Sequence, residues 1–414
     1  MYHLRVTRNY CRHISYISSE TTEESLKRSD FVEGAATVKK IIQGGFGLAF
    51  HKGKTVFLPY AAPGDKLEFS VSRKKGNIIF GHIERIISPS KLRKDPECPN
   101  FGKCGGCDFL HLDYENEIEI KKEMVLETFE RIGKIKADIS TITESPSRFG
   151  YRNHCIFRTD ESGRPGFTMA ETDNVIPFPE KGCLLLPEVM REAIARLSSD
   201  LLKPESEVRV RMDKFGAVHF WGLEDLFSPP DIVMEAGGYL FPVSPGAFFQ
   251  VNTFLNDKLI ELVLSLPEEE PRRITDLYCG AGFFTFPLAE KSTEVIGIEG
   301  DKEAHKNALS AAKLNGIQNV TFKSGRVEDK LRKTARADLI LSDPPRTGMT
   351  AKVIREIIKK GPKELIIVSC DPPTLARDTS RLIQAGYTAA GIHLVDLFPG
   401  TSHIETVACF RKNN

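Results

Sequence analysis

The sequence predicts an α/β fold in which the C-terminal third forms a doubly wound sheet and a small all-β module comes earlier in the chain. From residue 274 onward, apolar runs alternate with helical stretches, which is the pattern of a mostly parallel sheet covered by helices. The last two runs, 392–398 and 404–410, are joined by only a short turn, which favours an antiparallel hairpin. Between residues 31 and 87, short apolar runs alternate with glycine-containing turns, as in a small β-barrel.

Length and composition are those of a globular protein with more than one domain. At roughly 150 residues per domain, 414 residues predict two or three domains. Hydrophobic residues make up 41% of the chain and charged residues 27%, an ordinary balance for a soluble protein. The sequence contains neither a run of about 18 apolar residues nor a signal-peptide pattern. We therefore expect a soluble, cytoplasmic protein that binds no membrane, and we expect it to be a monomer.

The N-terminal segments differ strongly in composition. Residues 1–30 are polar, lack a sustained periodicity and are predicted to be disordered. The net charge of the whole chain is only +1, yet residues 30–94 hold twelve basic and five acidic side chains. The basic residues Lys52 and Lys54 and the Arg-Lys-Lys run at 73–75 can contact nucleic-acid phosphates. Aromatic residues in the same module, such as Phe57 and Phe80, are able to stack on bases, although core packing is the commoner role.

Three of the nine cysteines lie within ten residues, and this spacing predicts a metal site. Cys98, Cys104 and Cys107 are interspersed with glycines, which let the backbone fold closely around a metal. Thiolates suit structural zinc and an iron–sulfur cluster equally well, so the spacing leaves the metal open. A closed site needs a fourth ligand, for which the spacing alone leaves three alternatives: Cys155, Cys183 and His111.

An amphipathic helix is predicted after the cysteines, over residues 115–132. Its apolar side chains recur at helical spacing, at Ile118, Met124, Val125, Phe129 and Ile132. From 151 to 246 the pattern is mixed and predicts no definite architecture. Before the terminal hairpin, strands of the C-terminal sheet are predicted at 274–279, 295–299, 320–322, 339–343 and 365–370.

The first strand of that sheet ends in a glycine turn that favours a cofactor site. Residues 276–282 read Asp-Leu-Tyr-Cys-Gly-Ala-Gly, and Glu299 ends the next strand, 17 residues after Gly282. Glycines allow a ligand to approach the backbone, and an acid at that position can hold two ribose hydroxyls. Because the sequence has no Gly-Lys-Ser/Thr phosphate cradle, S-adenosylmethionine fits better than ATP or NAD. A plain tight turn is the alternative interpretation.

A second motif follows the fourth predicted strand, at the edge of the sheet where ligands bind. Here Asp343 is followed by Pro-Pro-Arg, and its carboxylate can accept hydrogen bonds from a planar base or a cofactor amine. Methyltransferases that act on exocyclic amines often have an aromatic residue where this chain has Arg346, which disfavours amine methylation. The alternative is a rigid Pro-Pro exit from the strand.

Two side chains near the end of the chain are suited to chemistry at a pyrimidine carbon. Cys370 ends a predicted strand just before a helix, whose N-terminal charge favours the thiolate. Glu405 shares a strand face with Val407 and Cys409, where an apolar side chain is the norm. C5 of uracil becomes nucleophilic only after a thiolate adds at C6, and a base must then remove the C5 proton. A buried core thiol and a solvated edge carboxylate are the alternatives.

Five motifs occur in a single order along the chain: Phe-Phe-Gln-Val-Asn at 248–252, the glycine turn at 276–282, Asp-Pro-Pro-Arg at 343–346, Ser-Cys-Asp-Pro-Pro-Thr-Leu-Ala-Arg-Asp at 369–378, and His-Ile-Glu at 403–405. Their combination resembles the RNA 5-methyluridine methyltransferase family, and the resemblance runs from about residue 31 to the C-terminus. In one departure, Phe283 stands where many relatives carry Asn, so the resemblance does not extend to a polar cofactor contact there.

The resemblance implies an enzyme that transfers methyl from S-adenosylmethionine to C5 of a specific uridine in RNA. It implies an OB-like, RNA-binding TRAM barrel at 31–90, a central α+β domain with an iron–sulfur cluster at 91–246, and a class I methyltransferase domain with a Rossmann-like, seven-stranded sheet at 247–414. Cys370 is then the nucleophile and Glu405 the base. The residues implied to line the cofactor and base pocket are Gln250, Tyr278, Gly280, Gly282, Glu299 and Asp343.

Cluster-bearing members of the family share the spacing of Cys98, Cys104 and Cys107 and have a further, distant cysteine. The resemblance therefore implies Cys183 as the fourth ligand of a [4Fe–4S] cluster, and it implies 23S rRNA as the substrate, since transfer-RNA members often lack the cluster. Uridine 54 of tRNA is the alternative target. A non-catalytic RNA-binding assembly factor is an alternative from another class, which the presence of Cys370 and Glu405 disfavours.

Overall fold

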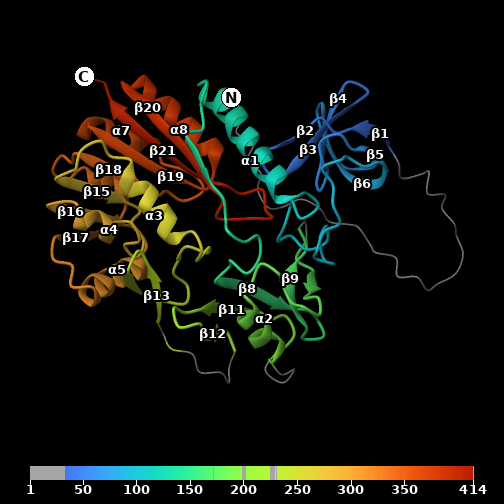
Figure 1. Cartoon of the computed structure of the whole chain (residues 1–414), viewed down its shortest axis with the longest axis horizontal. Coiled ribbons are helices and arrows are strands. Elements are labelled where there is room, and N and C mark those ends of the chain that lie inside the picture. Colours follow the sequence, from blue (N-terminus) through green and yellow to red (C-terminus); the bar gives the residue numbers. More distant parts are fainter. Residues whose placement is uncertain (1–32, 171, 198–201, 224–228, 230, 414) are drawn as a thin grey trace, which may run out of the picture.

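The structure is a computed structural model that describes residues 33–170, 172–197, 202–223, 229 and 231–413. The segment 1–30, predicted to be disordered, lies outside the described residues. The described part of the chain includes no helix that is both long enough and apolar enough to span a membrane. Figure 1 shows an N-terminal β-sheet and a large C-terminal α/β unit on either side of helix α1, with a smaller sheet of the central region below them.

The N-terminal sheet contains the short strands that the sequence predicts. Its six strands have the order β1-β5-β6-β4-β3-β2, and only the pairing of β4 with β6 is parallel. Alternate side chains point to one side and pack into a small core that includes Val38, Val56, Leu67 and Phe69. The strands are β1 (Gly34–Thr37), β2 (Lys40–Ile42), β3 (Phe46–His51), β4 (Lys54–Leu58), β5 (Lys66–Lys75) and β6 (Ile78–Ser88).

The predicted helix after the cysteines is present as α1 (Tyr114–Thr128), which continues into a π-helical turn, Phe129–Gly133. Ile118, Met124, Val125 and Phe129 are buried as predicted, but the prediction for Ile132 is wrong, because its side chain is 47% exposed. A π-helical turn holds more residues than an α-helical turn and so shifts the buried face. Gly133 is buried in its place and packs against the backbone of Ala376.

The central region, for which the sequence predicted no architecture, forms a five-stranded antiparallel sheet and a separate hairpin. The sheet has the order β10-β9-β8-β11-β12, and α2 (Glu188–Ala195) packs on one face. Its strands are β8 (His154–Thr159), β9 (Pro165–Thr168), β10 (Val175–Pro177), β11 (Glu207–Met212) and β12 (Val218–Trp221). The hairpin of β13 (Ile232–Ala236) and β14 (Tyr239–Val243) leads into α3 (Asn256–Ser265).

The C-terminal sheet confirms the predicted doubly wound topology and corrects its size. Its order is β17-β16-β15-β18-β19-β21-β20-β7, with β21 antiparallel to both neighbours, so the terminal hairpin is confirmed. Eight strands are present rather than seven, because β7 (Thr141–Thr143) from the central region pairs with β20. The other strands are β15 (Arg273–Leu277), β16 (Glu294–Glu299), β17 (Val320–Ser324), β18 (Leu339–Ser342), β19 (Glu364–Ser369), β20 (Tyr387–Val395) and β21 (Glu405–Lys412).

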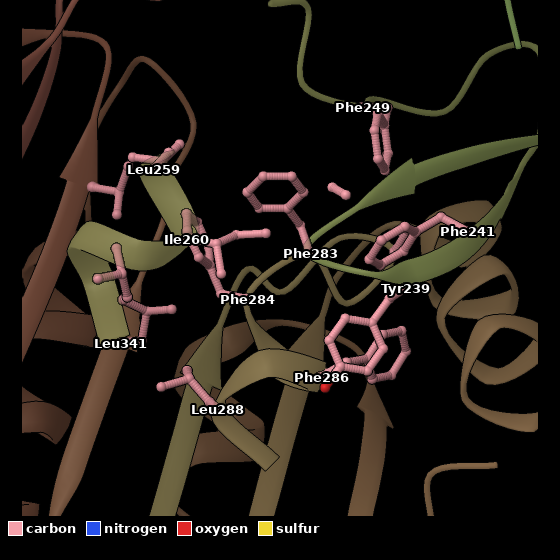
Figure 2. Packing of buried hydrophobic residues seen from close by; sticks show 14 of the residues in the cluster. Tyr239, Phe241, Phe249, Leu259, Ile260, Phe283, Phe284, Phe286, Leu288 and Leu341 are labelled. Atoms are coloured by element: carbon pink, nitrogen blue, oxygen red, sulfur yellow. The ribbon is translucent and has the colours of Figure 1, made fainter. Parts of the chain in front are cut away.

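Helices cover both faces of this sheet, which explains the nearly continuous apolar runs of its strands. Alternate residues of β19 enter different cores: Ile366 and Val368 pack with α3, α4 and the β13–β14 hairpin, while Leu365 and Ile367 pack with α6, α7 and α8. The first core is rich in phenylalanine (Figure 2). The helices are α4 (Thr285–Glu290), α5 (Lys302–Leu314), α6 (Val327–Leu331), α7 (Ala351–Lys360) and α8 (Pro372–Gln384).

Candidate active site

Most of the residues predicted to act in catalysis or cofactor binding lie where the central strands of the C-terminal sheet end. Tyr278 follows β15, Glu299 ends β16 and Asp343 follows β18. Cys370 follows β19, and Glu405 begins β21, which runs in the opposite direction. The carboxyl ends of parallel strands lie at one edge of a sheet, and this edge is where ligands bind in doubly wound folds. The topology therefore brings these five side chains to the same edge.

The glycine turn after β15 is tightly constrained on the sheet side and open on the other. Tyr278 has a φ of +61°, an unusual conformation for a bulky residue, and its backbone N–H donates to the carbonyl oxygen of Ile298 at 2.8 Å. Gly280 has a φ of +55°, and a Cβ there would meet no atom within 4 Å. A Cβ on Gly282 would lie 2.7 Å from the ring of Phe286. Gly282 thus packs on the helix, while Gly280 faces open space that a ligand can use.

The Glu299 carboxylate is held in place by two backbone N–H donors, one in the glycine turn and one just after β16. Its Oε2 accepts from the Gly280 N–H at 2.8 Å, and its Oε1 accepts from the Asp301 N–H at 2.7 Å. Burial and the Glu299 charge together raise the pKa of Asp343 to about 7. Glu299 and Asp343 stand at the ends of β16 and β18, the two strands that flank β15 at this edge of the sheet.

A third carboxyl group, Asp276, is completely buried beneath the turn. Burial is the main reason that its pKa is raised to about 8, with Asp343 and Glu299 adding to the effect. Thr285, which stands at the third glycine position of the dinucleotide motif, donates to Asp276 Oδ2 at 2.6 Å. Oδ1 of the same carboxyl has no hydrogen-bond partner. Three acidic side chains near one turn favour a cationic ligand, and S-adenosylmethionine carries a sulfonium and an ammonium group.

Gln250 and Phe283 are both buried. The backbone oxygen of Gln250 accepts from Asn153 Nδ2 at 2.8 Å. The neighbouring Phe249 ring lies 5.8 Å from the Phe283 ring, edge to face, and Phe283 also packs against Phe284 (Figure 2). The segment of Gln250 is therefore next to the glycine turn. Phe283 contributes to an aromatic core and makes no polar contact through its side chain.

Strand pairing sets Cys370 beside Glu405. In the antiparallel pair of β19 and β21, Ser369 lies opposite Thr406. Continuing this register by one residue brings Cys370, which follows Ser369, beside Glu405, which precedes Thr406. Glu405 is only 5% exposed, and burial together with the charge of Asp343 raises its pKa well above the usual range. A carboxylate with such a raised pKa is suited to accept a proton near neutral pH.

The protonation state predicted for Cys370 is not the one that the structure favours. Burial, followed by the charge of Glu405, raises the pKa of the Cys370 thiol to about 12. The following helix does not offset this effect, because its N-terminal Thr374 N–H already donates to the Asp371 carboxylate at 3.0 Å. Burial and the charge of Glu405 therefore favour the neutral thiol of Cys370 over the thiolate.

Arg346 is the residue of this site that sequence reasoning missed. Its positive charge lowers the pKa values of both Cys370 and Glu405, against the effect of burial. Its Nη2 lies 3.4 Å from Nε2 of His403, two residues before Glu405. The Asp-Pro-Pro-Arg motif includes this residue. The sequence argument used Arg346 only to note that an aromatic residue is absent there, and gave the arginine itself no role.

The four cysteines predicted as metal ligands lie in two segments of the central region, Cys98 to Cys107 and the residues just before α2. Cys104 pairs with Met169 across an isolated bridge, and Cys183 precedes α2. Burial, with smaller contributions from the charges of Cys183 and Cys98, raises the pKa of Cys104 to about 11. Cys107 and Cys183 border one small apolar cluster around Tyr151. Among the described residues, no three His, Cys, Asp or Glu side chains are grouped as a metal site, so the metal prediction is not confirmed.

The alternative fourth ligands have other surroundings. Cys155 is buried in the core of the five-stranded sheet. Nε2 of His111 lies 3.2 Å from the carbonyl oxygen of Ala61, and burial lowers the pKa of this histidine to about 4. Cys279 and Cys409 are buried, as predicted for core thiols.

Comparison with known families finds a match over the C-terminal part of the chain. Residues 234–413 match the model of a family described as tRNA (uracil-5-)-methyltransferase. A protein of Aquifex aeolicus, described as an uncharacterized RNA methyltransferase, is 32% identical, and the match covers 90% of this chain and 97% of that protein.

Two further relatives have more specific descriptions. The 23S rRNA (uracil(1939)-C(5))-methyltransferase RlmD of Pseudomonas fluorescens is 28% identical over 91% of this chain and 94% of its own length. Among solved structures, the Pyrococcus abyssi tRNA (uracil-54, C5)-methyltransferase in complex with S-adenosyl-L-homocysteine matches with a TM-score of 0.70 and 22% identity, over 91% of this chain and 100% of that one. The similarity to this solved structure shows that the fold is shared along nearly the whole chain.

Proposed function

Because the chain belongs to the RNA 5-methyluridine methyltransferase family, whose members are S-adenosylmethionine-dependent enzymes, we propose that it methylates C5 of a specific uridine through a covalent bond between Cys370 and C6. The observation that carries this proposal is the strand register that sets Cys370 beside Glu405 at the ligand edge of the sheet. The burial of Glu405, which is 5% exposed, also speaks against a solvated edge carboxylate.

In the proposed reaction Cys370 is the nucleophile. Its thiol releases a proton to solvent water, the thiolate sulfur bonds to C6 of the uracil, and the electron pair of the C5=C6 bond makes C5 nucleophilic. Arg346 supports the first event, since its charge lowers the pKa of Cys370. Bound S-adenosylmethionine supplies the electrophilic methyl group. Gly280, Glu299 and Asp343 are the residues proposed to hold it, together with Gln250, Tyr278 and Gly282.

Glu405 completes the reaction as the general base. It takes the proton from C5, the C5=C6 bond forms again, and the bond between C6 and sulfur breaks, which regenerates the Cys370 thiolate. The raised pKa of Glu405 supports this role, because the group then has enough affinity for the proton that it must accept.

Large-subunit ribosomal RNA is the proposed substrate. The similarity to an enzyme named for uracil in 23S rRNA and the clustered cysteines favour this target. Uridine 54 of tRNA is a second candidate, favoured by the family description and by the fold shared with a tRNA-modifying enzyme.

The test is to map 5-methyluridine in ribosomal and transfer RNA from cells with and without this protein. We expect one or more 5-methyluridines of 23S rRNA to disappear in its absence and to return when the wild-type gene is restored. Loss confined to tRNA would replace the proposed substrate, and loss of no 5-methyluridine would contradict the proposed function.

We also propose that Cys98, Cys104, Cys107 and Cys183 hold a [4Fe–4S] cluster. The raised pKa values of Cys104 and Cys107 support this, because the charges of the neighbouring cysteines add to the effect of burial, and a cationic centre would let these thiols become thiolates together. Gly105 supports it as well: a Cβ there would lie 2.9 Å from the Cα of Ala170, so the cysteine loop packs directly against the neighbouring backbone.

Protein purified without oxygen is therefore expected to contain iron and sulfide and to absorb broadly in the visible range. Replacing any one of the four cysteines with serine should remove that absorption, whereas Cys155→Ser, matched in residue type, should keep it. Stoichiometric zinc without iron would contradict the proposal.

For the N-terminal sheet, residues 31–90, we propose the role of an RNA-binding module of the TRAM type. Basic side chains gather at the turn between β5 and β6: the Arg73 guanidinium lies 4.8 Å from the ring centre of Phe80, Lys74 pairs with Glu33 at 3.2 Å, and Lys75 is exposed. Such a turn can bind phosphates without reading sequence, while the catalytic domain selects the uridine.

Neutralising Arg73, Lys74 and Lys75 to glutamine should weaken RNA binding most at low salt and leave the choice of uridine unchanged. Each phosphate contact removed should lower the slope of binding against salt by about one unit. Binding is measured across a salt series, with neutralisation of the exposed Lys306, Lys313 and Lys333 as the charge-matched control. Equal slopes and affinities for wild type and the first variant would leave this turn no part in RNA capture.

A further inference from the structure

The loop between β20 and β21 carries the proposed base, since Glu405 is the first residue of β21. This loop, residues 396–404, is named here the base loop. It also carries His403, whose ring lies beside Arg346. The position of Glu405 relative to Cys370 therefore depends on how the base loop is held, and the loop is held from outside the C-terminal sheet.

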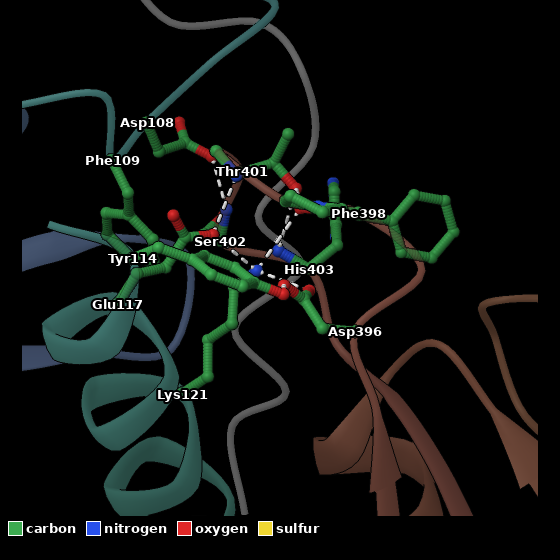
Figure 3. A network of polar contacts seen from close by, with 12 residues as sticks. Asp108, Phe109, Tyr114, Glu117, Lys121, Asp396, Phe398, Thr401, Ser402 and His403 are labelled. Atoms are coloured by element: carbon green, nitrogen blue, oxygen red, sulfur yellow. Dashed lines mark hydrogen bonds and ion pairs between the residues drawn. The ribbon is translucent and has the colours of Figure 1, made fainter. Parts of the chain in front are cut away.

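A buried ionic cluster on α1 fixes the start of the base loop (Figure 3). The Lys121 ammonium is completely buried and lies 2.7 Å from both a Glu117 oxygen and an Asp396 oxygen. Arg148 pairs with the other Glu117 oxygen at 2.7 Å, and Tyr114 donates to Asp396 Oδ2 at 2.8 Å. Two positive and two negative charges balance in this cluster. Buried ion pairs contribute little net stability but hold their partners in one geometry.

The carboxylates of Glu117 and Asp108 bind the backbone in the middle of the base loop. Glu117 Oε1 accepts from the Gly400 N–H, and Asp108 Oδ2 accepts from the Ser402 N–H, both at 2.7 Å. In return, the backbone N–H groups of Asp108 and Phe109 donate to the Gly400 carbonyl oxygen at 2.9 and 3.0 Å. Asp108 directly follows Cys107, so the cysteine segment is bonded to the loop that ends at Glu405.

We infer that Asp108 and the Glu117–Lys121–Asp396 cluster are positioning elements for the base: they set the base loop so that Glu405 reaches the C5 proton opposite Cys370. The inference rests on the proposed function. The inference predicts an effect on one step of the reaction, the removal of the C5 proton. The contacts described above constrain the loop that carries Glu405 and His403, whereas Cys370 is held by β19 and α8. Loosening the base loop should slow proton removal more than the addition of sulfur to C6.

The experiment compares Asp108→Ala with Asp108→Asn, whose side-chain oxygen can still accept from the Ser402 N–H. Full-length protein is mixed with substrate RNA and S-adenosylmethionine, and the covalent protein–RNA adduct and the kcat are measured. We expect Asp108→Ala to lower kcat by about tenfold to a hundredfold and to accumulate adduct, since a small misplacement of a catalytic group has an effect of that size. Asp108→Asn should restore most of both values, and the KM for RNA should change little.

Because Asp108 adjoins a proposed metal ligand, Tyr114→Phe provides a second test at a residue of α1 that is not next to a cysteine in sequence. It removes the hydrogen bond to Asp396 and keeps the shape of the side chain. We expect adduct accumulation in the same direction and of smaller size. If both variants lower the melting temperature but show the wild-type kcat and no extra adduct, the contacts are structural only and the inference is wrong. If Glu405→Gln is itself fully active and free of adduct, the base lies elsewhere, and the role proposed for Glu405 fails instead.

Discussion

Replacing Cys370 with alanine is expected to abolish methyl transfer while leaving the binding of S-adenosylmethionine nearly unchanged. Without the thiol no sulfur can add to C6, and C5 of uracil remains too weak a nucleophile to take the methyl group. The cofactor is proposed to bind through residues of other strand ends, such as Glu299 and Asp343, which the substitution does not touch. Transfer of labelled methyl to RNA and cofactor binding by calorimetry measure the two effects.

Cys409→Ala is the matched control for this experiment. Cys409 is also a buried thiol of the same sheet, but it lies in the core cluster, away from the strand ends. We expect this variant to keep most of its activity. Substantial turnover by Cys370→Ala would contradict the covalent mechanism.

The second large effect is expected for Glu405→Gln, which should accumulate a covalent protein–RNA adduct. The amide keeps the size of the buried carboxyl and removes its charge, so sulfur addition and methyl transfer can proceed. The C5 proton then has no acceptor, and the bond between C6 and sulfur cannot break. Labelled RNA that migrates with the protein under denaturing conditions measures the adduct.

Glu364→Gln, at the opposite end of β19, is the control, and it should turn over without accumulating adduct. A Glu405→Gln variant that is fully active and free of adduct would place the base elsewhere. The charge of Glu405 also raises the pKa of Cys370. Neutralising it should therefore make the thiolate easier to form, which favours adduct formation further.

The sequence predicted the elements of the C-terminal sheet well, because each strand is buried on both faces and reads as an apolar run. It also singled out Cys370, which follows the end of such a run, and Glu405, which stands where an apolar side chain is the norm. The family resemblance implied only their roles as nucleophile and base. Their closeness follows from the pairing of β19 with β21, a long-range register that no local pattern specifies.

Other features depend on tertiary contacts that leave weak traces in a sequence. The three residues of β7 become a strand only because β20 has a free edge. Glu117 and Lys121 are spaced like an ordinary exposed ion pair on a helix, yet both are completely buried. The neutral thiol of Cys370 is a further case, since burial outweighs the helix N-terminus on which the sequence argument relied.

The most direct measurement uses substrate RNA in which the target uridine is replaced by 5-fluorouridine. A base can remove a proton from C5 but cannot remove fluorine. The methylated adduct should therefore be trapped on the enzyme. The account predicts an adduct that forms only with S-adenosylmethionine and that mass spectrometry locates in the tryptic peptide 364–377, which contains Cys370 as its only cysteine. An adduct on another residue, or methylation of normal RNA with no adduct on 5-fluorouridine RNA, would contradict it.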